Sequence, residues 1–137
     1  MFEDVLADQN THWSGEPYPG GVPRRILSKL VVYLDLPHVI PVTGVRRCGK
    51  STLLRQAVNF LMKERGVPPA NILFLNLEHP RFNRYKGDPE NLERIFGDYL
   101  KAMSPKGRVY VLLDEVHFFD NWQVFVKARY EKKNVKF

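Results

Sequence analysis

The chain contains the stretch Gly44-Val45-Arg46-Arg47-Cys48-Gly49-Lys50-Ser51, which matches the pattern G-x-x-x-x-G-K-[ST] at every specified position. Glycines at this spacing permit backbone angles that turn successive N–H groups inward around phosphate oxygens. A helix that begins at such a loop also points its positive N-terminal end at the phosphates. The stretch therefore predicts a nucleotide-binding loop, and a structural glycine turn is the alternative.

The side chains of this loop have separate expected roles. Lys50 is expected to reach the β- and γ-phosphates, and the Ser51 hydroxyl is expected to coordinate Mg²⁺. Thr52 directly follows and completes the expected nucleotide-binding residues. Arg46 and Arg47 either contact phosphate or a neighbouring subunit, or are solvated loop arginines.

A second motif lies where the apolar stretch Val109–Leu113 leads into Asp114 and Glu115. Two carboxylates at the end of a buried strand are costly unless something there favours negative charge. In a parallel sheet, ligands bind beyond the carboxyl ends of the strands, where the phosphate loop also lies. Asp114 is therefore expected to hold Mg²⁺, usually through water, and Glu115 to orient and deprotonate an attacking water. For an acidic pair alone, a turn or helix cap is the alternative.

Around these motifs the apolar residues alternate between helical and strand spacing. Helices are predicted over 24–36, 53–66, 89–100 and 121–132, and strands over 39–42, 71–77, 108–113 and 135–137. Asp88 is expected to cap the third helix, and Asp120 and Gln123 provide a capping box for the fourth. This order predicts an α/β fold with a mostly parallel sheet in three α/β/α layers, of the P-loop NTPase type and incomplete at the C-terminal end.

Composition predicts a globular domain without a membrane span. The 137 residues suffice for one domain, 44% are hydrophobic, and no apolar run approaches the roughly 18 residues that cross a bilayer. The acidic start lacks the basic and apolar regions of a signal peptide. Cys48 is the single cysteine, which fits a reducing compartment, so a cytoplasmic location is expected. Its thiol either allows oxidation to block nucleotide or is merely small enough for the loop.

The net charge of +6 is unevenly distributed. Residues 1–23 contain four acids and no Lys or Arg, which leaves +10 on residues 24–137. The first segment is also rich in Pro and Gly towards its end and is interpreted as a separate N-terminal arm. The basic remainder indicates an anionic partner, either nucleotide or nucleic acid, or simply a solvated basic surface.

Three stretches, in this order and spacing, resemble a known family. They are VTGVRRCGKSTLLRQ (42–56), FLNLEHPRF (74–82) and VLLDEVHFFDNWQVFVK (111–127). They are similar to the AAA-type P-loop ATPases of archaea and bacteria, whose ATPase module is usually followed by a nuclease-like or helix-rich C-terminal domain. The resemblance covers residues 24–137, which would form the N-terminal part of that module.

The resemblance implies ATP as the nucleotide, with Lys50 and Ser51 on its phosphates and its Mg²⁺. It also implies Asp114 as the acid on the metal side and Glu115 as the general base. The chain departs from the family at His117, where Gln is common. It also ends where the family's fourth strand begins, so the sheet is expected to lack its middle, together with the sensor residue and the arginine finger. Whether this chain alone hydrolyses ATP is left open.

Several other residues have both a functional and a plain structural interpretation. Glu78 and His117 either face the site or end local elements, Arg81 and Arg84 either act on a partner or are solvated, and residues 127–136 either contact DNA or form an exposed helix end. The aromatic residues Phe118, Phe119, Trp122 and Phe125 are expected to pack in the core.

These observations predict an ATP-binding domain of an ATPase that uses Mg-ATP to move or remodel a partner. The alternatives are a nucleotide-gated switch with little hydrolysis and a protein that handles nucleic acid with ATP. A small-molecule kinase is disfavoured because Glu115 supplies a base for water. A homo-oligomer is a possible assembly, and the nucleic-acid or protein partner is not identified.

Overall fold

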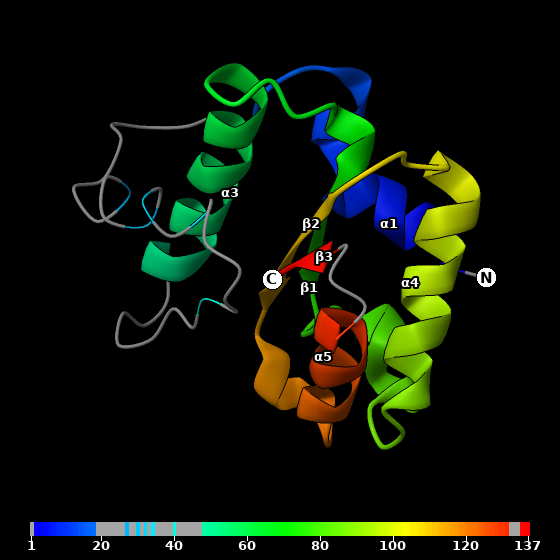
Figure 1. Ribbon diagram of the computed structural model, residues 1–137. Helices are drawn as coiled ribbons and strands as arrows, with labels where there is room; N and C mark the ends of the chain where they lie inside the picture. Colours follow the sequence, from blue (N-terminus) through cyan, green and yellow to red (C-terminus); the bar gives the residue numbers. More distant parts are fainter. Residues whose placement is uncertain are drawn as a thin grey trace.

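The structure, a computed structural model, describes residues 2–18, 27, 30, 32, 34, 40, 48–131 and 135–137, with the backbone alone for 48–50 (Figure 1). The α-helices are α1 (Glu3–Gln9), α3 (Cys48–Lys63), α4 (Glu90–Met103) and α5 (Trp122–Glu131). The strands are β1 (Ile72–Asn76), β2 (Val109–Asp114) and β3 (Val135–Lys136). The 3-10 helices are η1 (Thr11–Ser14), η2 (Pro69–Asn71), η3 (Pro80–Tyr85) and η4 (Val116–Phe118).

The strands form a parallel sheet in the order β1-β2-β3. Asn76 of β1 lies opposite Asp114 of β2, so both strands end at the same edge of the sheet. Beyond β3, the Ile40 N–H donates to the Phe137 carbonyl at 3.1 Å. Ile40 belongs to the predicted strand 39–42, whose other residues lie outside the described residues. Within the described residues, β3 is therefore the edge strand next to β2, and the bond from Ile40 to Phe137 lies on its other side, where the sheet was expected to lack its middle.

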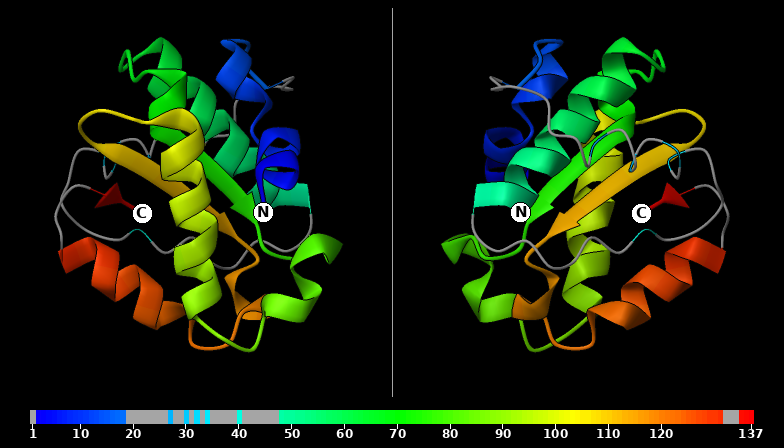
Figure 2. Two further views of the ribbon diagram at one scale, coloured as in Figure 1. Left: turned by 90° about the vertical axis from the view of Figure 1, so that its right-hand side faces the viewer. Right: turned by 90° about the vertical axis from the view of Figure 1, so that its left-hand side faces the viewer.

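Helices cover both faces of this sheet, α3 on one and α4 with α5 on the other (Figures 1 and 2). Successive side chains of β1 pack against different helices, because side chains in a strand point alternately to opposite faces of the sheet. On one face, Ile72 packs with Val58 and Leu61 of α3. On the other, Leu73 and Leu75 join the cluster formed with α4 and α5. The predicted three-layer α/β/α architecture is confirmed.

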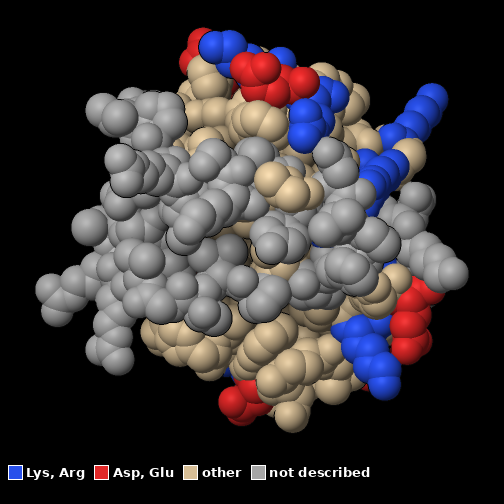
Figure 3. All heavy atoms as spheres, turned by 60° about the vertical axis from the view of Figure 1, so that its left-hand side comes forward, with Lys and Arg blue, Asp and Glu red and all other residues tan. Residues whose placement is uncertain are grey.

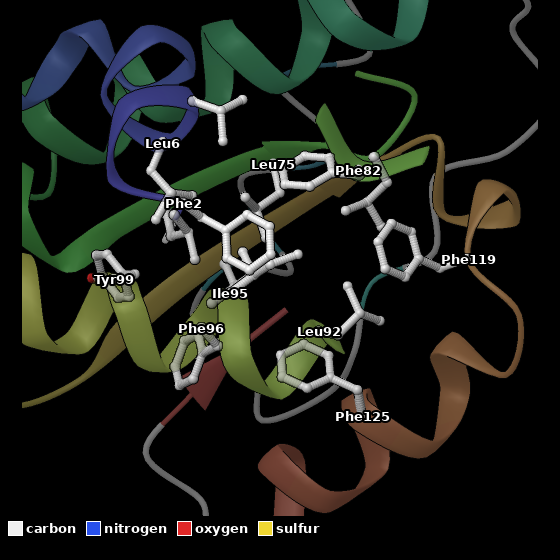
Figure 4. Close-up of a cluster of buried hydrophobic side chains, with 14 of the residues drawn as sticks. Phe2, Leu6, Leu75, Phe82, Leu92, Ile95, Phe96, Tyr99, Phe119 and Phe125 are labelled. Atoms are coloured by element: carbon white, nitrogen blue, oxygen red, sulfur yellow. The ribbon is translucent and has the colours of Figure 1, made fainter. Parts of the chain in front are cut away.

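The larger core cluster is rich in aromatic rings (Figure 4). Phe96 of α4 meets Phe125 of α5 edge to face, with ring centroids 5.9 Å apart, and Phe119 meets Phe82 in the same manner. This confirms the predicted burial of Phe119 and Phe125. Trp122 is partly buried against the same cluster.

Helix ends follow local signals in the sequence. The Asp88 carboxylate accepts the Glu90 N–H at 2.9 Å, so Asp88 caps the start of α4 as predicted. A second signal lies at the C-terminal end of α3. Gly66 has a φ of +65°, and the Val67 N–H donates to the Leu61 carbonyl, which ends the helix. The backbone is helical at residues 27, 30 and 32, within the predicted helix 24–36.

The N-terminal segment contains structure that the sequence analysis did not predict. Phe2, Val5 and Leu6 are at most 1% exposed and belong to the main core cluster. The Phe2 N–H also donates to the Asp98 carboxylate on α4. A helix of seven residues is stabilised mainly by packing, which periodicity over so short a stretch does not reveal. The division of the chain after residue 23 stays a prediction, because 19–23 lie outside the described residues.

Within the described part of the chain, none of the helices combines the length and apolar character needed to cross a bilayer.

Candidate nucleotide-binding site

The first turn of α3 and the carboxyl end of β2 meet at one hydrogen bond. The Ser51 hydroxyl donates to the Oδ2 atom of Asp114, which is 63 residues further along the chain. Asp114 is 3% exposed and Ser51 is partly buried, so water has little access to this contact. The structure therefore brings together the two residues that the sequence analysis assigned to Mg²⁺.

Local structure explains why these two side chains converge. Because α3 begins at Cys48, Ser51 lies in its first turn, where backbone N–H groups have no partner within the helix. Asp114 is the last residue of β2, an otherwise apolar strand between two layers of helices. A buried carboxylate at this place requires a donor, and Ser51 supplies one.

The rest of the predicted phosphate loop is described incompletely. Residues 44–47 lie outside the described residues, and for Cys48, Gly49 and Lys50 only a helical backbone is described. Thr52 is partly buried on α3. The expected nucleotide contacts of this loop, including that of Lys50, stay predictions.

Glu115 follows β2 with a left-handed backbone, at φ +58° and ψ +44°. This conformation costs a residue with a Cβ about 1–2 kcal/mol, and such strain concentrates at functional sites. The Phe118 N–H donates to the Glu115 carbonyl at 3.2 Å and so anchors the turn into η4. The turn sets the direction of the Glu115 side chain immediately after Asp114.

His117 lies next to this glutamate. Its Nε2 atom is 3.8 Å from the Oε2 atom of Glu115, and its side chain is 66% exposed. The two candidate residues are therefore neighbours at the rim of the site, and the contact is a weak one between partly solvated groups.

Other residues considered in the sequence lie away from this contact. Arg81 pairs with Asp4 at 3.1 Å, with side chains that are 50% and 62% exposed. Glu78 and Arg84 are exposed, and the Glu78 N–H donates to the side chain of Asn76. The pairing of Arg81 with Asp4 favours the structural interpretation of that arginine.

Asn76 is a site neighbour that the sequence analysis did not single out. It ends β1 directly opposite Asp114, so it lies at the same edge of the sheet. Its position at the end of a strand parallel to β2 was the available signal, because the carboxyl ends of parallel strands meet at one edge.

The basic stretch 127–136 does not form a uniform exposed surface. Arg129 binds the Glu93 carboxylate of α4 through two nitrogen atoms, at 2.5 and 3.1 Å, and Lys136 is 4% exposed. On the face in Figure 3, the described Lys and Arg side chains lie near Asp and Glu along the margins of the molecule. The described residues on this face thus show mixed charge.

Fold and site together define an α/β module in which a serine at the start of a helix bonds to an aspartate at the end of a parallel strand. Residues 37–137 match the AAA domain family, so the chain belongs to that family, which has an ATPase-type nucleotide-binding module. An uncharacterized protein of Haemophilus influenzae is 33% identical over 102 residues. That match covers 74% of this chain but only 24% of the relative, so the matched region spans about a quarter of the relative's length. No solved structure matches the chain significantly.

Proposed function

We propose that this chain binds Mg-ATP between the first turn of α3 and the carboxyl end of β2, and that it drives a partner by hydrolysing the nucleotide. The observation that carries the proposal is the hydrogen bond from Ser51 to Asp114. Supporting it is membership of the AAA domain family over residues 37–137. The motif residues Gly44 to Thr52 would surround the phosphates.

The donor set fits Mg²⁺. A serine hydroxyl and a carboxylate are hard oxygen ligands, and Mg²⁺ in nucleotide sites is usually held by one or two such groups together with phosphates and water. When bound, Mg²⁺ neutralises charge on the phosphate oxygens.

The chain's own residues would divide the reaction between them. Lys50 would stabilise negative charge on the β- and γ-phosphates. Glu115 would accept a proton from water while the water oxygen attacks the γ-phosphorus. The bond between the γ-phosphorus and the oxygen that leaves with ADP would then break. The turn that fixes Glu115 beside Asp114 supports this role.

The first experiment measures the affinity of a fluorescent ATP analogue for the chain, by titration with and without Mg²⁺. Saturable, Mg²⁺-dependent binding is expected, with loss of at least about tenfold in affinity for Lys50→Ala. Ser51→Thr should retain binding because Thr satisfies the motif. Ser14→Ala, at an exposed position of η1, is the matched control for Ser51→Ala. Binding that is unchanged in Lys50→Ala and Ser51→Ala would contradict the proposed site.

The turnover arm measures phosphate release with excess Mg-ATP. Glu115→Gln is expected to bind the analogue normally and to lose about 100-fold or more in phosphate release, because it removes the base alone. Release that is equal in both proteins would exclude Glu115 as the base. Binding without release in the unmodified chain would favour a nucleotide-gated switch.

A further inference from the structure

The outer edge of β1 is covered by side chains of the N-terminal segment, residues 2–18. In this strand the N–H and carbonyl groups of Leu73 and Leu75 face β2, in phase with the bond from the N–H of the following Leu77 to the Asp114 carbonyl. The groups of Ile72, Phe74 and Asn76 face away from the sheet. An edge of this kind normally pairs with another strand or is protected.

Two consecutive amide side chains occupy the positions of a neighbouring strand. Asn10 accepts the Phe74 N–H at 2.6 Å and donates to the Phe74 carbonyl at 2.9 Å. Gln9 accepts the Asn76 N–H at 3.1 Å and donates to the Asn76 carbonyl at 3.0 Å. Each amide therefore reproduces the pair of bonds that a residue of an antiparallel strand makes.

The remaining outward groups of β1 are also paired. The Ile72 carbonyl accepts from Nε2 of His12 at 2.8 Å and from Nε1 of Trp13 at 2.9 Å. The Ile72 N–H donates to Pro69 in η2. From Gln9 to Trp13 the segment thus meets Asn76, Phe74 and Ile72 in turn, antiparallel to β1.

The sequence of β1, which these side chains cover, favours self-association. Residues 72–77 read ILFLNL, which contains no charge and no proline and has high β-propensity. An antiparallel pair of two β1 strands centred on Phe74 would place Ile72 opposite Asn76 of the second copy. Such a contact obeys two-fold symmetry. Because the partner is a second copy of the chain, its concentration always equals that of the protein.

We propose that Gln9 and Asn10 act as a strand substitute that excludes the β1 strand of a second copy of this chain. Removing their amide groups takes away the side-chain partners of the Phe74 and Asn76 backbone groups, of which the Asn76 carbonyl keeps the His79 N–H at 3.4 Å, and frees this edge of β1 from residues 9 and 10. The second copy then pairs with β1 edge to edge, and the protein becomes a dimer.

The test uses Gln9→Met with Asn10→Leu, near-isosteric changes that replace the amides with apolar groups, and Gln123→Met at an exposed position of α5 as the control. In the double variant, light scattering is expected to show a rise to twice the monomer mass with concentration. At dilution, the Phe74 and Asn76 amides should exchange with solvent at least about tenfold faster than in the unmodified chain, and slow again in the dimer.

A folded double variant that stays monomeric at every concentration would overturn the proposal. So would rapid exchange of these two amides in the unmodified chain. If the double variant does not fold, Gln9→Met alone decides. Faster exchange at Asn76 with Phe74 unchanged supports the proposal, because Gln9 covers Asn76 and Asn10 still covers Phe74, whereas unchanged exchange at Asn76 refutes it.

Discussion

His12 is a fully buried histidine whose two ring nitrogens both have partners. Its Nε2 atom lies 2.8 Å from the Ile72 carbonyl, and because a carbonyl only accepts, this nitrogen carries the proton. Its Nδ1 atom lies 2.9 Å from the oxygen of the Tyr18 hydroxyl, which donates to the Gln9 carbonyl at 2.6 Å. Burial lowers the pKa of His12 from its ordinary value of 6.5 and raises the pKa of Tyr18 to about 12, so both groups are neutral at pH 7.

This lowered pKa predicts a loss of stability in acid. Below about pH 6.5 the unfolded chain takes up a proton on His12 that the folded protein resists, so the free energy of unfolding falls as the pH drops. Denaturant unfolding between pH 7 and pH 5 should show a steeper fall for the unmodified chain than for His12→Gln. Equal slopes would exclude the contribution of His12, and His79→Gln, a change at a partly exposed histidine, is the control.

Residues of the site differed in how well the sequence predicted them. The meeting of Ser51 with Asp114 followed from two motifs and from the rule that parallel strands end at one edge. The left-handed backbone of Glu115 did not, because glutamate has no preference for positive φ. That conformation is imposed by the turn into η4 and by the packing around it.

At the scale of elements, the same change is expected to have opposite effects at Gly97 and Gly107. Gly97 lies inside α4, and Gly107 lies in a turn with a φ of +81°, and neither has a heavy atom within 4 Å of an added Cβ. Gly97→Ala should raise the free energy of unfolding by about 0.5–1 kcal/mol through helix propensity. Gly107→Ala should lower it by about 1 kcal/mol through backbone strain.

Denaturant unfolding of the two variants measures both effects at once, with each serving as the control for the other. A loss of stability in Gly97→Ala would indicate that the space beside α4 is smaller than the structure shows.

The elements also show where local signals suffice. The start of α4 was predicted from Asp88, whose carboxylate bonds the Glu90 N–H. In contrast, the apolar side of α1 consists of Val5 and Leu6 with the preceding Phe2, and the stability of this helix depends on the surface of β1 and α4 against which it packs. Contacts between residues far apart in the chain have no local signature, so α1 was interpreted as part of an arm.

At the scale of the molecule, the N-terminal segment should contribute strongly to global stability. Phe2 is 1% exposed and contacts the rings of Phe82 and Tyr85 at 5.8 and 5.1 Å between centroids. Phe2→Ala is expected to cost about 3–5 kcal/mol in denaturant unfolding, because it removes a buried ring and leaves a cavity. Asp8→Ala, at an exposed position of α1, should cost less than about 0.5 kcal/mol. Equal effects would mean that the segment packs only loosely.

The architecture as a whole was predictable because strands and helices alternate with regular spacing, which restricts the chain to a parallel sheet between helical layers. The cover of the β1 edge was not predictable. It depends on amide side chains at two positions meeting backbone groups 64 and 67 residues away.

The same separation has a consequence for synthesis on the ribosome. The N-terminal segment emerges first, and the strand that it covers follows after about 3–13 s at 5–20 residues per second. During that interval Phe2, Val5 and Leu6 have no native surface to pack against, although they are fully buried in the finished protein. The nascent chain therefore presents a short apolar stretch for which the molecular chaperones that bind emerging polypeptides can compete before β1 arrives.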